Sequence, residues 1–99
     1  SAIPVGEVTD SVRQITADGS SIALDRASLR AVQTPQTFSL SLLREAYSGG
    51  YSPLFTDDAS VVEAAGHKVA LFDGDTTNIK ITRPADLAIA QLIINKKDE

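Results

Sequence analysis

The sequence predicts an α/β layered fold, and three observations support that prediction. First, apolar runs of strand length alternate with segments of helical spacing along residues 27–99. Second, a polar segment in front of them alternates as a β-hairpin does. Third, 42% of the residues are hydrophobic and 22% are charged, which is the composition of a globular domain. About three core strands are visible, fewer than the roughly five or six of an average sheet, so we expect an incomplete sheet.

The chain begins on a strand-like segment, Ile3-Pro4-Val5, and we expect it to be part of something longer. Residues 7–16 then alternate as a strand. Asp18-Gly19 supplies a turn, because glycine accepts a positive φ at little cost, and residues 21–24 can return as the partner strand. Neither face of this hairpin is fully apolar, and an isolated two-stranded arm is marginal in water. We therefore expect residues 7–26 to lie against another subunit.

The middle of the chain predicts a short strand and two short helices. The apolar run 29–32 is stopped by Thr34-Pro35, which alone indicates a structural turn. Residues 39–47 have helical spacing, and the serine at their start is a plausible N-cap. A second helix is expected to start near Thr56 and to end at Gly66, because glycine favours the conformation that follows a helix.

The C-terminal part predicts two more strands and a final helix. Residues 69–72 and 79–82 have strand composition, with a turn at 73–75 between them. The last helix is expected to begin near Pro84 and to end around Lys96 and Lys97, whose charges match the helix dipole, as does Asp86 in its first turn. Apolar residues surround most of that helix, so we expect it to pack into a larger body.

Composition excludes several function classes. A net charge of −4 and a pI near 4.8 argue against a general nucleic-acid binder, which needs a basic face for phosphates. The longest apolar stretch, residues 87–94, is too short to cross a bilayer, and the N-terminus lacks the basic region of a signal peptide. With no cysteine and one histidine, neither a disulfide framework nor a zinc site is expected. A cytoplasmic location is compatible with these features.

Taken one at a time, the candidate chemical residues have plain structural explanations. Lys80, between two isoleucines, is best explained as an edge-strand lysine that discourages aggregation. Thr56-Asp57-Asp58 is best explained as a helix start with a threonine cap, although a helix N-terminus can also hold a polyol phosphate. His67 follows a glycine in a loop and is expected to be solvated rather than catalytic.

Read together, the motifs carry more information than any one of them. The motifs are Asp10-Ser11-Val12-Arg13, Asp25-Arg26, residues 31–38 around Gln33-Thr34-Pro35-Gln36, Thr56-Asp57-Asp58-Ala59-Ser60, and Asn78-Ile79-Lys80-Ile81-Thr82. In order and with fitting gaps, they resemble the second half of the 2-C-methyl-D-erythritol 4-phosphate cytidylyltransferase family, and the resemblance spans nearly the whole chain.

The resemblance implies both an architecture and an assembly. The expected fold is the C-terminal part of a Rossmann-like nucleotidyltransferase α/β/α layered fold with a protruding β-hairpin arm. Residues 1–99 would be the C-terminal half of that domain. Within it, residues 7–26 would form a dimerisation arm and residues 27–99 the α/β part. A homodimer is implied, joined through the arm.

The resemblance also implies a reaction. The family transfers CMP from CTP to 2-C-methyl-D-erythritol 4-phosphate in non-mevalonate isoprenoid synthesis, with Mg²⁺ bound, and pyrophosphate leaves. Catalysis of this kind depends on positioning and charge stabilisation. By resemblance, Lys80 would be catalytic and neutralise charge at the transferring phosphate, and Thr56 and Asp57 would contact the acceptor. Arg26 and Ser11 would reach into the neighbouring subunit's site, where a guanidinium binds phosphate through two hydrogen bonds.

Departures from the family pattern limit what this chain is expected to do. Serine stands at position 11 where threonine is common, arginine at 13 where lysine is common, and Arg83 where relatives place a helix-capping threonine. The glycine-rich basic loop for the CTP phosphates, the cytosine-binding residues and the metal-binding aspartate have no counterpart, so the Mg²⁺ ligands are expected in an absent N-terminal half. The chain alone is therefore expected to be inactive. The alternatives are a non-catalytic dimerisation or phosphate-ligand-binding module derived from this fold, and a related sugar-nucleotide transferase.

Overall fold

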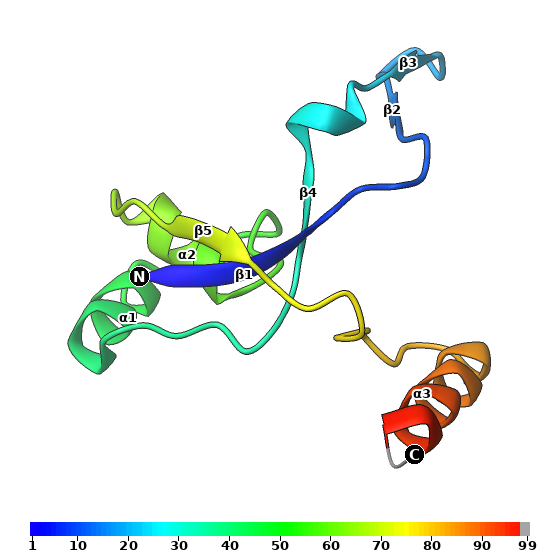
Figure 1. The fold of residues 1–99 in the computed structure, drawn as a ribbon. Coiled ribbons are helices and arrows are strands. Elements are labelled where there is room, and N and C mark those ends of the chain that lie inside the picture. Colours follow the sequence, from blue (N-terminus) through cyan, green and yellow to red (C-terminus); the bar gives the residue numbers. More distant parts are fainter. Residues whose placement is uncertain (98–99) are drawn as a thin grey trace.

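The computed structural model describes residues 1–97 and contains a small mixed sheet, a separate hairpin and three α-helices (Figure 1). In chain order the elements are β1 (Ala2–Glu7), β2 (Arg13–Ile15), β3 (Ser21–Ala23), the 3₁₀ turn η1 (Arg26–Ser28), β4 (Arg30–Val32), α1 (Leu40–Tyr47), α2 (Asp58–Ala64), β5 (Ala70–Asp73) and α3 (Pro84–Lys97). The predicted α/β class is confirmed.

The central sheet has the strand order β4-β1-β5. β1 runs antiparallel to β4, with Val5 opposite Val32, and parallel to β5, with Ile3 opposite Leu71. Parallel neighbours require a crossover, and here the crossover carries β2, β3, β4, α1 and α2. The expected small number of core strands is confirmed, although their membership differs from the prediction.

The core lies between the sheet and the two helices of the crossover. Ile3 and Val5 alternate along β1 onto one face and pack against Ala59 of α2. A second cluster joins α1 to α2 through Ala46, Val61 and Val62. These six apolar side chains are the buried hydrophobic core of the described residues. The core therefore fixes α2, and with it the loop that precedes α2, against the sheet.

Two elements extend from this core (Figure 1). The β2–β3 hairpin pairs Gln14 with Ile22, and its turn places Gly19 at a φ of 86°, as the sequence predicts. α3 lies apart from the sheet, with Leu87 59% and Leu92 69% exposed. No helix within residues 1–97 combines the length and the apolarity that crossing a membrane requires.

The predicted strand over residues 7–16 is wrong. Its first residue closes β1, only 13–15 pair in the hairpin, and residues 8–12 are not in a strand. Within this stretch the carbonyl of Val12 accepts the backbone N–H of Leu24 at 2.9 Å, and the carbonyl of Thr9 accepts Nη1 of Arg26 at 2.7 Å. These separate contacts do not form a strand ladder.

The predicted strand over residues 79–82 is also wrong. The backbone N–H groups of Asn78 and Ile79 bond locally, to the carbonyls of Asp75 and Thr77, at 3.0 Å each. The N–H of Thr82 donates to the Asp86 carboxylate at 3.1 Å. With these donors engaged in a turn and a helix start, the segment is a loop, and Lys80 is a loop residue rather than an edge-strand lysine.

Helix starts follow the sequence closely, with one correction. Ser39 caps α1 as predicted, but α2 is capped by Asp57 and not by Thr56. Gly66, with a φ of 93°, follows the end of α2 as predicted. At the start of α3 the carboxylate of Asp86 accepts from the N–H groups of Thr82 and Arg83.

His67 differs from the expectation of a solvated side chain. It is half-buried, and its Nε2 atom is buried without a hydrogen-bond partner among the described residues. His67 lies three residues beyond the end of α2, and its backbone N–H bonds to the carbonyl of Val62 in that helix at 3.3 Å.

Candidate functional site

Three segments far apart in the sequence meet at one cleft of about 340 Å³. The cleft brings together Lys80, Thr56 and Asp57, which are three of the five residues that the sequence singled out. Its full lining is Val32, Gln33, Thr34, Gln36, Thr56, Asp57, Asn78, Ile79 and Lys80. The segments around Gln33, Thr56 and Asn78 are three of the five segments that carry the family resemblance, and the fold brings these three together in space.

Asp57 is held from both sides. Its Oδ1 accepts the backbone N–H of Ser60 at 2.8 Å, and its Oδ2 accepts Nε2 of Gln36 at 3.1 Å. In return, Oγ of Ser60 accepts the Asp57 N–H at 3.2 Å, which completes a capping box. Burial opposes ionisation of Asp57, but the hydrogen bonds from Ser60 and Gln36 together outweigh it and hold the pKa of the carboxyl below its usual 3.8. Asp57 is therefore a carboxylate with a fixed orientation.

Gln36 has a second contact that ties it to the same helix. Its Oε1 accepts the backbone N–H of Ala59 at 3.2 Å. One side-chain amide thus bonds both to the cap and to the first turn of α2.

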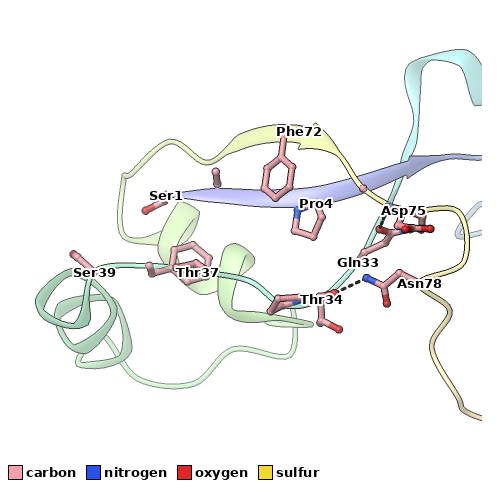
Figure 2. A pocket seen from close by; sticks show the side chains of 13 residues that line it. Ser1, Pro4, Gln33, Thr34, Thr37, Ser39, Phe72, Asp75 and Asn78 are labelled. Atoms are coloured by element: carbon pink, nitrogen blue, oxygen red, sulfur yellow. Dashed lines mark hydrogen bonds between the residues drawn. The ribbon is translucent and has the colours of Figure 1, made fainter.

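Gln33, which also lines the cleft, uses both ends of its carboxamide as Gln36 does, here on the backbone of Asp75. Its Nε2 donates to the carbonyl of Asp75 at 2.9 Å, and its Oε1 accepts the Asp75 N–H at 3.2 Å. The neighbouring Gly74 makes this approach possible, since a Cβ there would lie 2.0 Å from Oε1 of Gln33. Asn78 adds a third tie, donating from Nδ2 to the carbonyl of Thr34 at 2.6 Å (Figure 2).

A larger cavity of about 700 Å³ lies beyond Gln33 and Thr34, where Pro4 and Phe72 face the segment before α1 (Figure 2). Its lining residues carry one charged side chain, that of Asp75. The smaller cleft differs in charge, because Lys80 is the one basic residue among its lining residues and the larger cavity is lined by no lysine or arginine.

A third cavity, of about 470 Å³, shares Thr56 and Asp57 with the cleft. It contains a hydrogen bond from the hydroxyl of Tyr47 to Oδ1 of Asp58. This bond raises the pKa of Tyr47 above its usual 10.0, with burial and the negative charges of Asp58 and Asp57 adding to the effect. Tyr47 therefore links the end of α1 to the first residue of α2 through this hydrogen bond.

The two remaining predicted residues do not lie in the cleft. Arg26 lines a separate cavity of about 370 Å³ with Glu7 and Arg30, and Ser11 is exposed on the segment leading to the hairpin. Figure 1 shows the β2–β3 hairpin projecting away from α2. Within one chain, Ser11 and Arg26 are therefore not brought together with Lys80.

Sequence reasoning gave no role to three residues that shape the cleft, namely Gln33, Gln36 and Asn78. All three are carboxamides, which can donate and accept at once. Their signal in the sequence is the placement of Gln33 and Gln36 on either side of Thr34-Pro35.

The cleft can hold an anion and hydroxyl groups, and it offers no metal-binding set. Among residues 1–97 there is no group of three or more His, Cys, Asp or Glu side chains arranged to hold a metal ion. In the cleft itself Asp57 is the sole carboxylate, and both its oxygens are engaged. The described residues therefore do not provide a site for the Mg²⁺ that the resemblance implies.

The chain matches the protein-family model described as IspD: 2-C-methyl-D-erythritol 4-phosphate cytidylyltransferase over residues 1–96. Two similar relatives are named 2-C-methyl-D-erythritol 4-phosphate cytidylyltransferase. The protein from Phocaeicola vulgatus is 50% identical over 92 residues, which are 93% of this chain and 42% of the relative. The protein from Rubrobacter xylanophilus is 48% identical, over 98% of this chain and 43% of the relative. The chain thus spans less than half the length of these relatives.

Solved structures agree with this match. The 2-C-methyl-D-erythritol 4-phosphate cytidylyltransferase from Thermus thermophilus superposes with a TM-score of 0.79 at 37% identity, covering 95% of this chain and 48% of that one. The 4-diphosphocytidyl-2C-methyl-D-erythritol synthase from Anaerococcus prevotii gives a TM-score of 0.80 at 27% identity, covering 95% and 45%. The predicted Rossmann-like nucleotidyltransferase fold is confirmed.

Proposed function

The chain belongs to the 2-C-methyl-D-erythritol 4-phosphate cytidylyltransferase family, and we propose that it forms the acceptor-substrate side of a cytidylyltransferase active site. The observation that carries this proposal is the convergence of Lys80, Thr56 and Asp57 on one cleft. The whole protein would transfer CMP from CTP to 2-C-methyl-D-erythritol 4-phosphate and release pyrophosphate. The family relationship supports a place in isoprenoid precursor synthesis.

The proposed chemistry is a substitution at phosphorus. A phosphate oxygen of the acceptor attacks the α-phosphorus of CTP, a P–O bond forms, and the bond to the pyrophosphate oxygen breaks. Such reactions depend on positioning and on stabilising charge. Lys80, exposed at the cleft, neutralises negative charge at the reacting phosphates. Asp57 is ionised and can only accept hydrogen bonds, and each of its oxygens, which already accepts one bond, has a second lone pair that can orient a hydroxyl of the polyol. Thr56 binds beside it.

The proposed site draws its remaining residues from a second subunit. Ser11 and Arg26 lie outside the cleft of their own chain and would reach the cleft of the neighbour through the hairpin arm, residues 7–26. Two observations support this arrangement: the hairpin projects from the core, and its Ile15 and Ile22 are 73% and 54% exposed (Figure 1). Arg26 would bind the acceptor phosphate through two hydrogen bonds, which a lysine cannot reproduce. The functional protein is then a homodimer.

We assign the chain to the C-terminal half of the family's length, because its motifs follow the order expected for that half. The glycine-rich loop for CTP and the ligands of Mg²⁺ would belong to the part of the relatives that the chain does not span. Mapping residues 1–96 onto a full-length relative tests the assignment, and a match to the first half would overturn it. The 99-residue chain alone is accordingly proposed to be inactive.

A pyrophosphate-release assay with CTP, Mg²⁺ and 2-C-methyl-D-erythritol 4-phosphate tests the function. The protein as its gene encodes it should turn over, and the 99-residue chain alone should not. Turnover by the short chain would contradict its proposed inactivity. Acceptor binding without turnover by the gene-encoded protein would favour the non-catalytic module, and no binding at all would overturn the proposed function. The matched variant is Lys80→Ala, with Lys68→Ala, outside the cleft, as its control.

A further inference from the structure

Two glutamines, three residues apart, line the cleft and bond to two segments that lie far apart in the sequence. Gln33 uses both ends of its carboxamide on the backbone of Asp75, at 2.9 and 3.2 Å. Gln36 uses both ends of its own on the start of α2, donating to Asp57 at 3.1 Å and accepting from Ala59 at 3.2 Å. A bond at each end fixes the rotation of the carboxamide as well as its distance. The short segment between these residues therefore joins the backbone of Asp75 to the start of α2.

We propose that Gln33 and Gln36 are positioning residues that together set the separation of Lys80 from Asp57. The inference rests on the proposed function, since these are the two charged groups assigned to the acceptor substrate. Neither glutamine needs to touch the substrate. Each acts through the backbone or side chain that it holds.

The contacts of Gln33 restrict the start of the loop that leads to Lys80. Gly74 leaves room for the carboxamide at a place where any Cβ would collide with it at 2.0 Å. From Asp75 the chain runs five residues to Lys80 as a loop, and the bond from Asn78 to the carbonyl of Thr34 holds its middle at 2.6 Å. Because the loop has no strand partner among the described residues, these contacts, and not a sheet, determine where Lys80 lies.

The contacts of Gln36 connect the start of α2 to the hydrophobic core. Ala59, whose N–H bonds to Gln36, is 2% exposed and packs against Ile3 and Val5 of β1. Gln36 therefore connects Asp57 to a residue that packs on the sheet, Ala59. Gln33, three residues earlier in the same segment, holds the start of the loop that carries Lys80. Small misplacements of catalytic groups reduce reaction rates by large factors, so the contacts of Gln33 and Gln36 have a direct effect on turnover.

Amide hydrogen exchange tests the contacts without any assay of activity, in the protein as its gene encodes it. Gln33→Leu should speed exchange at the Asp75 N–H about tenfold and leave the Ala59 N–H unchanged, while Gln36→Leu should do the reverse. Each variant is the matched control of the other. Unchanged exchange at both positions would overturn the inference.

Kinetic coupling tests the functional part. Lys80→Ala should reduce kcat/KM by a smaller factor in the Gln33→Leu background than in the wild type, because a displaced lysine contributes less. A purely structural role would lower stability and leave the two effects multiplicative, and that result would overturn the inference. Gly74→Ala should likewise be less damaging in a Gln33→Ala background, where the colliding atoms are gone. Selective exchange changes in a protein that neither binds nor turns over the acceptor would instead contradict the proposed function.

Discussion

The carboxylate of Asp57 accepts Nε2 of Gln36 at 3.1 Å on one oxygen, while its other oxygen caps α2. A residue 21 positions away thus fixes the orientation of a helix cap that also forms a wall of the cleft. The stability of α2 and the shape of the candidate site are consequently linked through one side chain.

Asp57→Ala should lower the free energy of unfolding by about 1 kcal/mol, the typical effect of losing an N-cap. Urea denaturation of the gene-encoded protein, followed by circular dichroism, measures this difference. Thr56→Val is the matched control, because Asp57 and not Thr56 caps the helix, and it should change stability by less than about 0.5 kcal/mol. A larger effect at Thr56 than at Asp57 would contradict the cap seen in the structure.

Stability should fall in acid because of the same carboxyl. The folded-state pKa of Asp57 lies below 3.8: burial opposes the shift, and the bonds from Ser60 and Gln36 outweigh it. A depressed folded pKa contributes stability above the unfolded value that is lost as pH falls through the folded one. Unfolding free energies measured between about pH 5 and pH 2 should therefore decline, and less steeply in Asp57→Asn.

Asp18 and Asp86 also contribute to the loss of stability in acid, so the unfolding free energy of Asp57→Asn should still decline as the pH falls. The pKa of Asp18 is lowered chiefly by the hydroxyl of Thr16, and that of Asp86 chiefly by the backbone N–H of Arg83. Both carboxyls contribute in the same pH window as Asp57. A profile in Asp57→Asn identical to that of the unaltered protein would show that Asp57 is not one of the stabilising carboxylates.

Local rules predicted the parts of this fold that depend on neighbouring residues. Ser39 caps α1 and Gly19 turns the hairpin as their chemistry dictates, because the bonding partners lie within four residues. The strand predicted at 79–82 fails for the opposite reason. Its residue types suit a strand, but a strand exists only where another strand offers a ladder, and here the donors bond locally.

Motif order singled out Lys80, Thr56 and Asp57, although each had a simpler structural explanation by itself, and the structure brings the three to one cleft. Their roles toward a substrate stay predictions. The ties that join them, such as Gln33 to Asp75, bridge 42 positions and leave no periodic signal in the sequence. Residues that act through another residue's backbone are therefore the ones that sequence reasoning misses.

Lys80→Ala should reduce kcat/KM for cytidylyl transfer by about 10²–10³-fold, the usual effect of removing one group that stabilises transition-state charge. Lys80→Arg should retain part of the activity, since it keeps the charge and changes only its geometry. Lys68→Ala should be near wild type, because it lies outside the cleft. Steady-state kinetics on the gene-encoded protein measure all three, and equal losses at Lys80 and Lys68 would contradict the assignment.

The exposed isoleucines of the hairpin should drive self-association. Ile22→Lys places a charge on the arm and should weaken the dimer by about tenfold or more in dissociation constant, as judged by sedimentation. Leu54→Lys alters an equally prominent apolar side chain, 80% exposed but outside the arm, and should leave the dimer intact. A well-behaved monomer in the unaltered protein at high concentration would contradict the proposed dimer.

Mixed dimers can show whether Arg26 acts on the neighbour's cleft. A heterodimer of Arg26→Ala and Lys80→Ala subunits would contain one cleft with both residues intact and one with neither, if Arg26 acts across the interface. Equal, random mixing should then restore about a quarter of wild-type turnover, because half the dimers are mixed and each has one working site. If Arg26 instead acts within its own chain, every cleft keeps one defect and mixing restores nothing. Lys80→Ala mixed with Asp57→Asn is the control, since both residues line one cleft and no mixed dimer contains an intact site.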